Sequence, residues 1–323
     1  MQVASEVGGN SYLMTALNVL EQVINSSSND IVLCDYIAEL QTLTSDENFC
    51  LNAQKTAEFI QRLGEANFYR ICKAHHFQLE RVKETSESTP DFSLCGWDVF
   101  FEVKTLSVVT GNYELSKSLE RSLEAQISIE DQLRQGRTVA MGESEVMPYG
   151  DKASNSGPIS GVINTLLEKI RQNIKAGQYS QGPTFLVVDL SLIAPDRTDN
   201  LILRPAYADD YLFSKAVTGT LWHVAFGRPG APILGNPEFE GAKCVESIME
   251  KVGVLVDDKF QFVKGIIFVI HPWNKPAEVW SLERDSLHDE LARTHPGLLD
   301  SLRQLVGNNW NDESDTNGFC LTG

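Results

Sequence analysis

The chain contains 323 residues, of which 42% are hydrophobic and 22% are charged, and its net charge is −17 at pH 7. This length and balance predict a globular protein with one large or two modest domains, and the negative charge argues against strong sequence-independent binding of nucleic acid, which depends on Lys and Arg contacts to phosphate. No apolar run is long enough to span a bilayer and no apolar leader opens the chain, so we expect a cytoplasmic protein with no membrane partner.

Two stretches with helical spacing of apolar residues open the chain, at 11–26 and at 31–43. Residues 1–54 contain no Lys or Arg at all. We therefore expect a helical N-terminal extension over residues 1–53. Either it covers the core of the protein or it serves interaction or regulation.

A stronger amphipathic helix is predicted over residues 53–74, followed by a strand at Phe77–Val82. Basic residues outnumber acidic residues in this stretch, which leaves room for a locally basic surface on an acidic protein. The basic residues are Lys55, Arg62, Arg70, Lys73, Arg81 and Lys83.

The stretch from Thr89 to Thr105 is the most informative in the chain. Val99–Val103 is aromatic and β-branched, which predicts a buried strand. Cys95-Gly96 offers a tight turn, so Pro90–Leu94 can pair back as the other strand of a hairpin. Side chains alternate along a strand, so Glu102 and Lys104 should share one face with Asp91 beside them.

Two carboxylates and an amine in a run this apolar indicate a site, because burying a charge is costly unless the charge is paired or binds a metal. Carboxylate oxygens are ligands for hard cations such as Mg²⁺. A structural interpretation also stands: Asp91 as a turn residue after proline, with Glu102 and Lys104 as an ion pair on a half-exposed face.

The hairpin is followed by a predicted insertion over residues 107–158, made of an amphipathic helix at 112–135 and a loop at 137–158. The insertion leaves the end of the candidate site strand, so it either touches the substrate or is a plain surface excursion. A second amphipathic helix at 159–176 then leads into a continuous apolar strand at Thr184–Leu190.

Predicted strands and helices continue to alternate over the rest of the chain. Strands are predicted at Leu221–Phe226, Phe262–Ile270 and, as an edge strand, Ala277–Leu282, and a helix is predicted near 241–252. Residues 284–306 have helical spacing with a break at Pro296, and residues 307–323 have the composition of a frayed acidic tail. We expect one domain over 54–282 and a C-terminal helical segment with a tail over 283–323.

Pro90-Asp91 followed by Glu102-Val103-Lys104 resembles the PD-(D/E)xK motif of the restriction-endonuclease-like nuclease superfamily. The predicted element order over about 55–190, α-β-β-β-α-β, is similar to the core order of that superfamily. The resemblance implies a three-layer α/β core with a mixed central sheet, here with a helical N-terminal extension and a C-terminal α/β elaboration.

The resemblance also implies an activity: Mg²⁺-dependent hydrolysis of phosphodiester bonds by an endonuclease, with Mn²⁺ as a possible substitute, acting on DNA in restriction, phage defence or repair. Asp91 and Glu102 would then bind the metal and Lys104 would position the attacking water. The helix before the hairpin often supplies another acidic ligand in this family, and Glu65 matches best, with Glu58 second.

Three further predictions concern partners. Lys169, Arg171 and Lys175 on the 159–176 helix form either a phosphate-binding edge or a solvated basic face. A homodimer or a partner subunit could supply more positive charge. The alternatives to a DNA endonuclease are an RNA substrate and a catalytically inactive nuclease fold that acts as a scaffold for protein partners.

Overall fold

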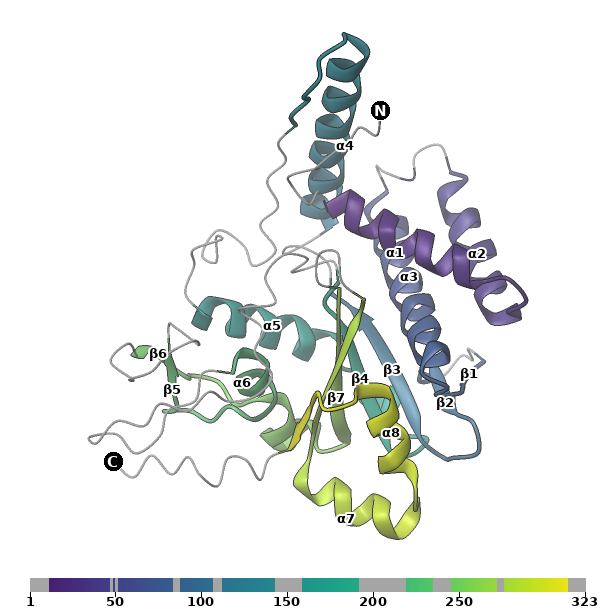
Figure 1. The fold of residues 1–323 in the computed structure, drawn as a ribbon. Helices are drawn as coiled ribbons and strands as arrows, with labels where there is room; N and C mark the ends of the chain where they lie inside the picture. Colours follow the sequence, from purple (N-terminus) through teal and green to yellow (C-terminus); the bar gives the residue numbers. More distant parts are fainter. Residues whose placement is uncertain are drawn as a thin grey trace.

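The chain forms a mixed α/β fold around one seven-stranded sheet, shown in the computed structural model of Figure 1. The structure describes residues 12–46, 49, 52–83, 88–106, 112–142, 159–191, 219–234, 245–271 and 276–312. The strand order is β1-β2-β3-β4-β7-β8-β9. The strands are β1 (Leu79–Arg81), β2 (Phe92–Leu94), β3 (Phe100–Thr105), β4 (Thr184–Asp189), β7 (Val263–Ile270), β8 (Glu278–Glu283) and β9 (Trp310–Asp312).

The sheet is mixed in direction. Strands β1, β2 and β3 form an antiparallel meander, and β3, β4 and β7 run parallel in the centre. Strand β8 is antiparallel to β7 and parallel to β9. A separate pair, β5 (Pro232–Leu234) and β6 (Val245–Ile248), lies outside this sheet.

Helices cover both faces of the sheet, which gives three layers. One face packs against α1 (Tyr12–Ser26), α2 (Ile31–Thr44), α3 (Ala53–Ala74), α7 (Asp285–Thr294) and α8 (Leu298–Val306). The other face packs against α5 (Ile159–Asn173) and α6 (Thr220–Phe226). The side chains of β3 alternate as expected: Phe101 and Val103 enter the first core, and Leu106 just beyond the strand enters the second.

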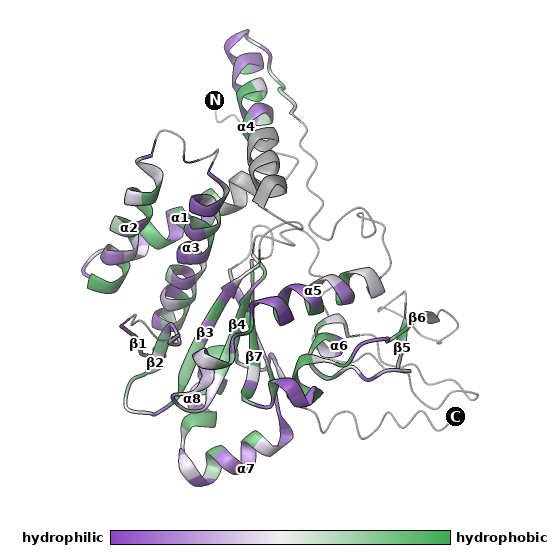
Figure 2. Ribbon diagram, turned by 180° about the vertical axis from the view of Figure 1, so that it is seen from behind, coloured by the Kyte–Doolittle hydropathy of each residue, from purple (hydrophilic) through white to green (hydrophobic). Residues whose placement is uncertain are grey.

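The three N-terminal helices pack on one another, and α2 and α3 begin at well-formed caps. The Asp30 side chain accepts a hydrogen bond from the N–H of Leu33 at the start of α2, and the Asn52 side chain accepts from the first turn of α3. Helices α1 and α2 alternate between hydrophobic and hydrophilic residues around their surfaces (Figure 2), and their apolar residues join the core that α3 builds. The predicted helical extension is therefore packed against the α3 side of the sheet.

Most predicted elements are confirmed, including the three N-terminal helices, the meander, β4, β7 and the helix pair that breaks at Pro296. The predicted helix at 112–135 is α4 (Asn112–Arg134), which stands away from the layers in Figure 1. Residues 143–158 of the predicted loop and 313–323 of the predicted tail lie outside the described residues.

Three predicted elements in the C-terminal half are wrong. The predicted strand at Leu221–Phe226 is the helix α6, whose residues are all buried, and a short apolar run has no period that separates helix from strand. The segment near 241–252, predicted to be a helix, contains the strand β6, which pairs with β5. Strand β8 is not an edge strand, because Trp310–Asp312, within the segment predicted to be a tail, forms the strand β9 and pairs with β8.

Within the described residues, no helix combines the length and the apolar character that crossing a bilayer requires.

Candidate active site

The β2–β3 hairpin places Asp91 opposite Glu102. Gly96 adopts a positive φ of 81° in the turn, and the register pairs Phe92 with Phe101. Continuing that antiparallel register by one residue sets Asp91 against Glu102, and the Asp91 N–H donates to the carbonyl of Phe101 over 3.1 Å. The predicted proximity of Asp91, Glu102 and Lys104 is confirmed.

The edge of β3 beyond the end of β2 is covered by side chains in place of a strand. The Val103 N–H donates to Asp91 Oδ2 over 2.7 Å. The Gln61 side chain on α3 donates to the Val103 carbonyl over 2.7 Å and accepts from the Thr105 N–H over 3.2 Å. These bonds satisfy the backbone of β3 and fix Asp91 and Gln61 in place.

Glu102 is fully buried on the α5 side of the sheet, where Lys104 reaches it. Lys104 Nζ lies 2.5 Å from Glu102 Oε1, so the two side chains share a face as predicted. Gln178, in the 3₁₀ turn Ala176–Tyr179 after α5, also donates to Glu102 Oε1. Glu102 Oε2 has no hydrogen-bond partner among the described residues.

Glu65 on α3 is buried and held by three neighbours. Its Oε2 accepts from the Tyr36 hydroxyl over 3.2 Å and from Arg62 Nη1 over 3.0 Å. Its Oε1 accepts from Gln61 Nε2 over 3.1 Å. The same Gln61 amide therefore ties Glu65 to the edge of β3, and the carboxylate has one orientation.

These side chains line one cavity of about 290 Å³. Its walls come from α2, α3, the β2–β3 hairpin and the turn after α5. Glu58 lines it as well as Glu65, so both acidic residues proposed from α3 face the cavity. The lining residues that carry charge are Glu58, Arg62, Glu65, Arg81, Asp91, Glu102 and Lys104.

The cavity raises the pKa of two of its carboxyl groups, Glu102 and Asp91. Burial raises the pKa of Glu102 to about 7, although the Lys104 ammonium opposes the shift. Burial and the negative charges of Glu65 and Glu102 also raise the pKa of Asp91 well above its usual value. Placing acidic groups together in this way costs free energy in the absence of a cation.

The polar atoms around Glu102 fit a hard cation. Besides Glu102 Oε2, the side-chain oxygen of Gln178 and the hydroxyl of Tyr179 are buried without a partner among the described residues. Oxygen ligands of this kind are those that Mg²⁺ and Mn²⁺ take. Within the described ranges, no three His, Cys, Asp or Glu side chains are close enough to hold one ion by themselves, so a cation here would keep several waters.

The basic residues predicted on the 159–176 helix do not line this cavity. Arg171 pairs with Asp257 over 2.9 Å and lies over the ring of Phe260 at 5.7 Å. Burial lowers the pKa of Lys169. Lys175 lies beyond the end of α5 and is exposed, and its positive charge acts on Glu102.

The sequence alone does not point to three polar residues that donate hydrogen bonds to Glu65 or Glu102: Tyr36, Gln61 and Gln178. Each comes from a different element. Tyr36 and Gln178 reach the acidic residues only through tertiary packing, and Gln61 reaches the backbone of β3 in the same way. Gln61 lies four residues before Glu65, which is one helical turn, and this spacing is the only local signal for any of the three.

Comparison of the chain with protein-family models, with curated proteins and with solved structures gives no match.

We expect Gly64→Ala to destabilise the protein, because α3 and β3 meet at Gly64. A Cβ there would lie 1.8 Å from Thr105 Oγ1 and 2.9 Å from Thr105 Cβ, so the helix would have to move away from the strand. The expected loss is about 1–3 kcal/mol of unfolding free energy, measured by urea denaturation.

The added variant Thr105→Ala separates this clash from a general effect on the helix. Thr105 Oγ1 has no partner among the described residues, so Thr105→Ala alone should cost little. Together with Gly64→Ala it should restore part of the lost stability. A double variant no more stable than Gly64→Ala would show that the contact is not the cause.

Proposed function

We propose that this cavity hydrolyses phosphodiester bonds in DNA with the help of Mg²⁺ or Mn²⁺, as the active site of a restriction-endonuclease-like endonuclease. The observation that carries the proposal is the meeting of Asp91, Glu102 and Lys104 from one hairpin with Glu65 from the preceding helix in one cavity. The order α3-β1-β2-β3-α5-β4, interrupted by α4, supports the same family.

Asp91 and Glu102 would hold the cation, with Glu65 as a supporting acidic group. A bound divalent cation polarises a phosphoryl oxygen and lowers the pKa of a coordinated water. The chain supplies the rigidity: Asp91 is fixed by the Val103 N–H, and Glu65 is fixed by Tyr36, Gln61 and Arg62. Carboxylates held in advance need no reordering when the substrate arrives.

Lys104 would act on the water and on the developing charge of the phosphate. It sits beside Glu102 with its side chain only 17% exposed, so its ammonium is held in place by an ion pair. From this position it can orient the attacking water and stabilise the negative charge that gathers on the phosphoryl oxygens. The leaving oxygen takes its proton from solvent or from a group of the cavity.

The test is cleavage of supercoiled plasmid, linear duplex, single-stranded DNA and RNA of matched sequence with Mg²⁺ or Mn²⁺. We expect metal-dependent cleavage of DNA by the wild type and loss of it in Asp91→Asn. Asp285→Asn, an exposed carboxylate at the start of α7, is the matched control and should cleave normally. Preferential cleavage of RNA would correct the substrate, and a folded protein that cleaves nothing in any condition would favour the scaffold alternative.

A further inference from the structure

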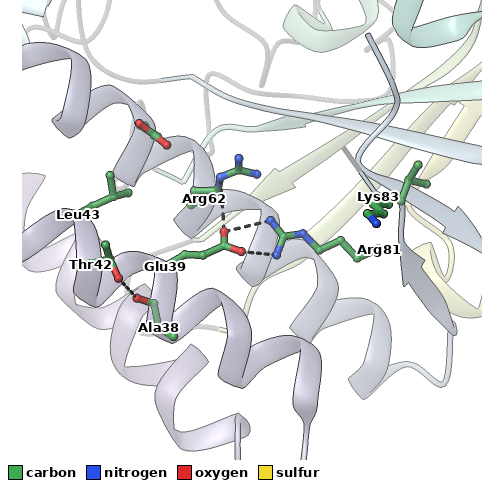
Figure 3. A pocket seen from close by; sticks show the side chains of 9 residues that line it. Ala38, Glu39, Thr42, Leu43, Arg62, Arg81 and Lys83 are labelled. Atoms are coloured by element: carbon green, nitrogen blue, oxygen red, sulfur yellow. Dashed lines mark hydrogen bonds and ion pairs between the residues drawn. The ribbon is translucent and has the colours of Figure 1, made fainter. Parts of the chain in front are cut away.

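A second concavity continues from the candidate active site. Its volume is about 690 Å³, and it lies between α2, α3 and the residues from β1 to Lys83 (Figure 3). It shares Glu58, Arg62, Arg81 and Val82 with the lining of the active-site cavity. The two therefore adjoin, and we call this second concavity the α2–α3 groove.

The α2–α3 groove carries the basic residues that immediately precede the hairpin. Arg62, Arg81 and Lys83 line it, against Glu39 and Glu58. The protein as a whole has a net charge of −17, so a groove with more basic than acidic side chains beside the catalytic cavity differs from the rest of the chain. Such a groove favours an anionic ligand that reaches the active site.

Glu39 on α2 accepts hydrogen bonds from the guanidinium group of Arg81 with both of its carboxylate oxygens, as a bound phosphate would. Arg81 Nη1 and Nη2 donate to the two oxygens of Glu39 over 2.5 Å and 3.0 Å, and Arg62 Nε lies 3.6 Å from the same carboxylate, as Figure 3 shows. This two-bond geometry is also the one that arginine uses for phosphate. Arg81 lies over the Tyr36 ring at 4.2 Å, which keeps its guanidinium in place.

We propose that the α2–α3 groove binds the phosphodiester backbone of the nucleic-acid strand on one side of the scissile bond. Arg81 is the principal phosphate contact, and Glu39 is an internal competitor that holds Arg81 when no strand is bound. The N-terminal helices then have a function of their own, because α2 forms one wall of the substrate path. This inference rests on the proposed function, since it extends the substrate from the same cavity.

The test is equilibrium binding of fluorescein-labelled single-stranded and duplex oligonucleotides, followed by anisotropy in Mg²⁺. All variants carry Lys104→Ala so that the probe is not cleaved. We expect Arg81→Gln to weaken binding about tenfold and to reduce the slope of log K against log salt by about one. Glu39→Gln should strengthen binding several-fold, because it releases Arg81 and removes a negative charge from the groove.

Matched controls come from α4, where Arg134 pairs with Glu130 on an exposed face. Arg134→Gln and Glu130→Gln make the same charge changes away from the groove and should leave Kd within about twofold. Arg81→Lys keeps the charge without the two-bond geometry and should bind with intermediate affinity. Thermal melting of each variant shows whether a weaker binder is still folded.

The outcomes separate this inference from the proposed function. Equal Kd values for the Arg81, Glu39 and control variants would overturn the proposal that the α2–α3 groove binds the strand, even if the wild type cleaves the same oligonucleotides. Binding that changes as expected, with no cleavage by the wild type, would support the groove and overturn the hydrolytic function. Absence of binding to either probe by a folded protein would overturn the groove, and cleavage by the wild type alone would then decide the function.

Discussion

Lys104→Ala is expected to lower the rate of metal-dependent DNA cleavage by about 10²–10⁴-fold, the usual contribution of a positioned acid–base or electrostatic group. The ammonium of Lys104 lies 2.5 Å from Glu102 Oε1 and forms an ion pair with it. Removing it leaves Asp91, Glu102 and Glu65, the carboxylates proposed to bind the metal, in place. We therefore expect kcat to fall while the binding of Mn²⁺ is retained, measured by single-turnover cleavage with saturating protein and by metal titration.

Lys264→Ala is the matched control for this experiment. Lys264 is also a partly buried strand lysine in an ion pair, with Glu290 over 2.7 Å, but it lies on β7 away from the cavity. Its removal should leave the cleavage rate unchanged. If Lys104→Ala cleaves within a few-fold of the wild type, the lysine is a structural partner of Glu102 and the proposed role is wrong.

Arg303→Met is expected to destabilise the protein by about 3–5 kcal/mol, because it leaves a buried charge without its main partner. Glu283 on β8 is fully buried, and Arg303 on α8 donates to its two oxygens over 2.7 Å and 2.8 Å. Ser281 and His288 complete the contacts of this carboxylate. Arg303 also lies 3.8 Å from the ring centre of Trp310, so the arginine joins α8, β8 and β9.

The pH dependence of stability identifies Glu283 as the cause. Burial alone would raise the pKa of Glu283, but the hydrogen bonds from Arg303 and His288 lower it from 4.5 to about 2. The pair therefore stabilises the folded state fully above pH 4.5 and loses this effect as the pH falls toward 2. Urea denaturation should show a difference in unfolding free energy between wild type and Arg303→Met that is largest near neutral pH and becomes smaller as the pH falls from 4.5 toward 2.

Two variants control this prediction. Arg134→Met removes an arginine whose side chain is 74% exposed and should change stability by no more than about 0.5 kcal/mol. Glu283→Leu with Arg303→Met removes the buried charge with its partner and should recover much of the loss. A double variant as unstable as Arg303→Met would show that packing against Trp310, and not the unpaired carboxylate, sets the cost.

The hairpin could be predicted from the sequence because its signals are local. Gly96 marks the turn, the apolar run marks the strand, and the antiparallel register then fixes Asp91 opposite Glu102. Helices such as α3 and α5 can also be predicted from the sequence, because their apolar residues recur with helical spacing. The secondary structure of α6 and β6 cannot be predicted in this way, because it depends on burial and on pairing with distant residues.

The sequence points to the acidic residues of the candidate site and to Lys104, but not to the glutamine side chains, Gln61 and Gln178, that hydrogen-bond the acidic residues. Asp91, Glu102 and Lys104 lie within one hairpin, whereas Gln178 reaches Glu102 from 76 residues away. Arg171 fits a substrate-binding role by sequence, yet its partner Asp257 lies in a turn that no local pattern connects to α5. The sequence predicts which side chains are charged, and tertiary packing decides which of them meet.

Binding of Mn²⁺, followed by the electron paramagnetic resonance of the free ion, examines the proposed metal site by itself because it needs no substrate. We expect saturable binding by the wild type that Asp91→Asn and Glu102→Gln each weaken about tenfold or more, while Asp285→Asn binds normally. Failure of the folded wild type to bind Mn²⁺, or binding that both cavity variants leave unchanged, would contradict a metal-dependent active site in this cavity.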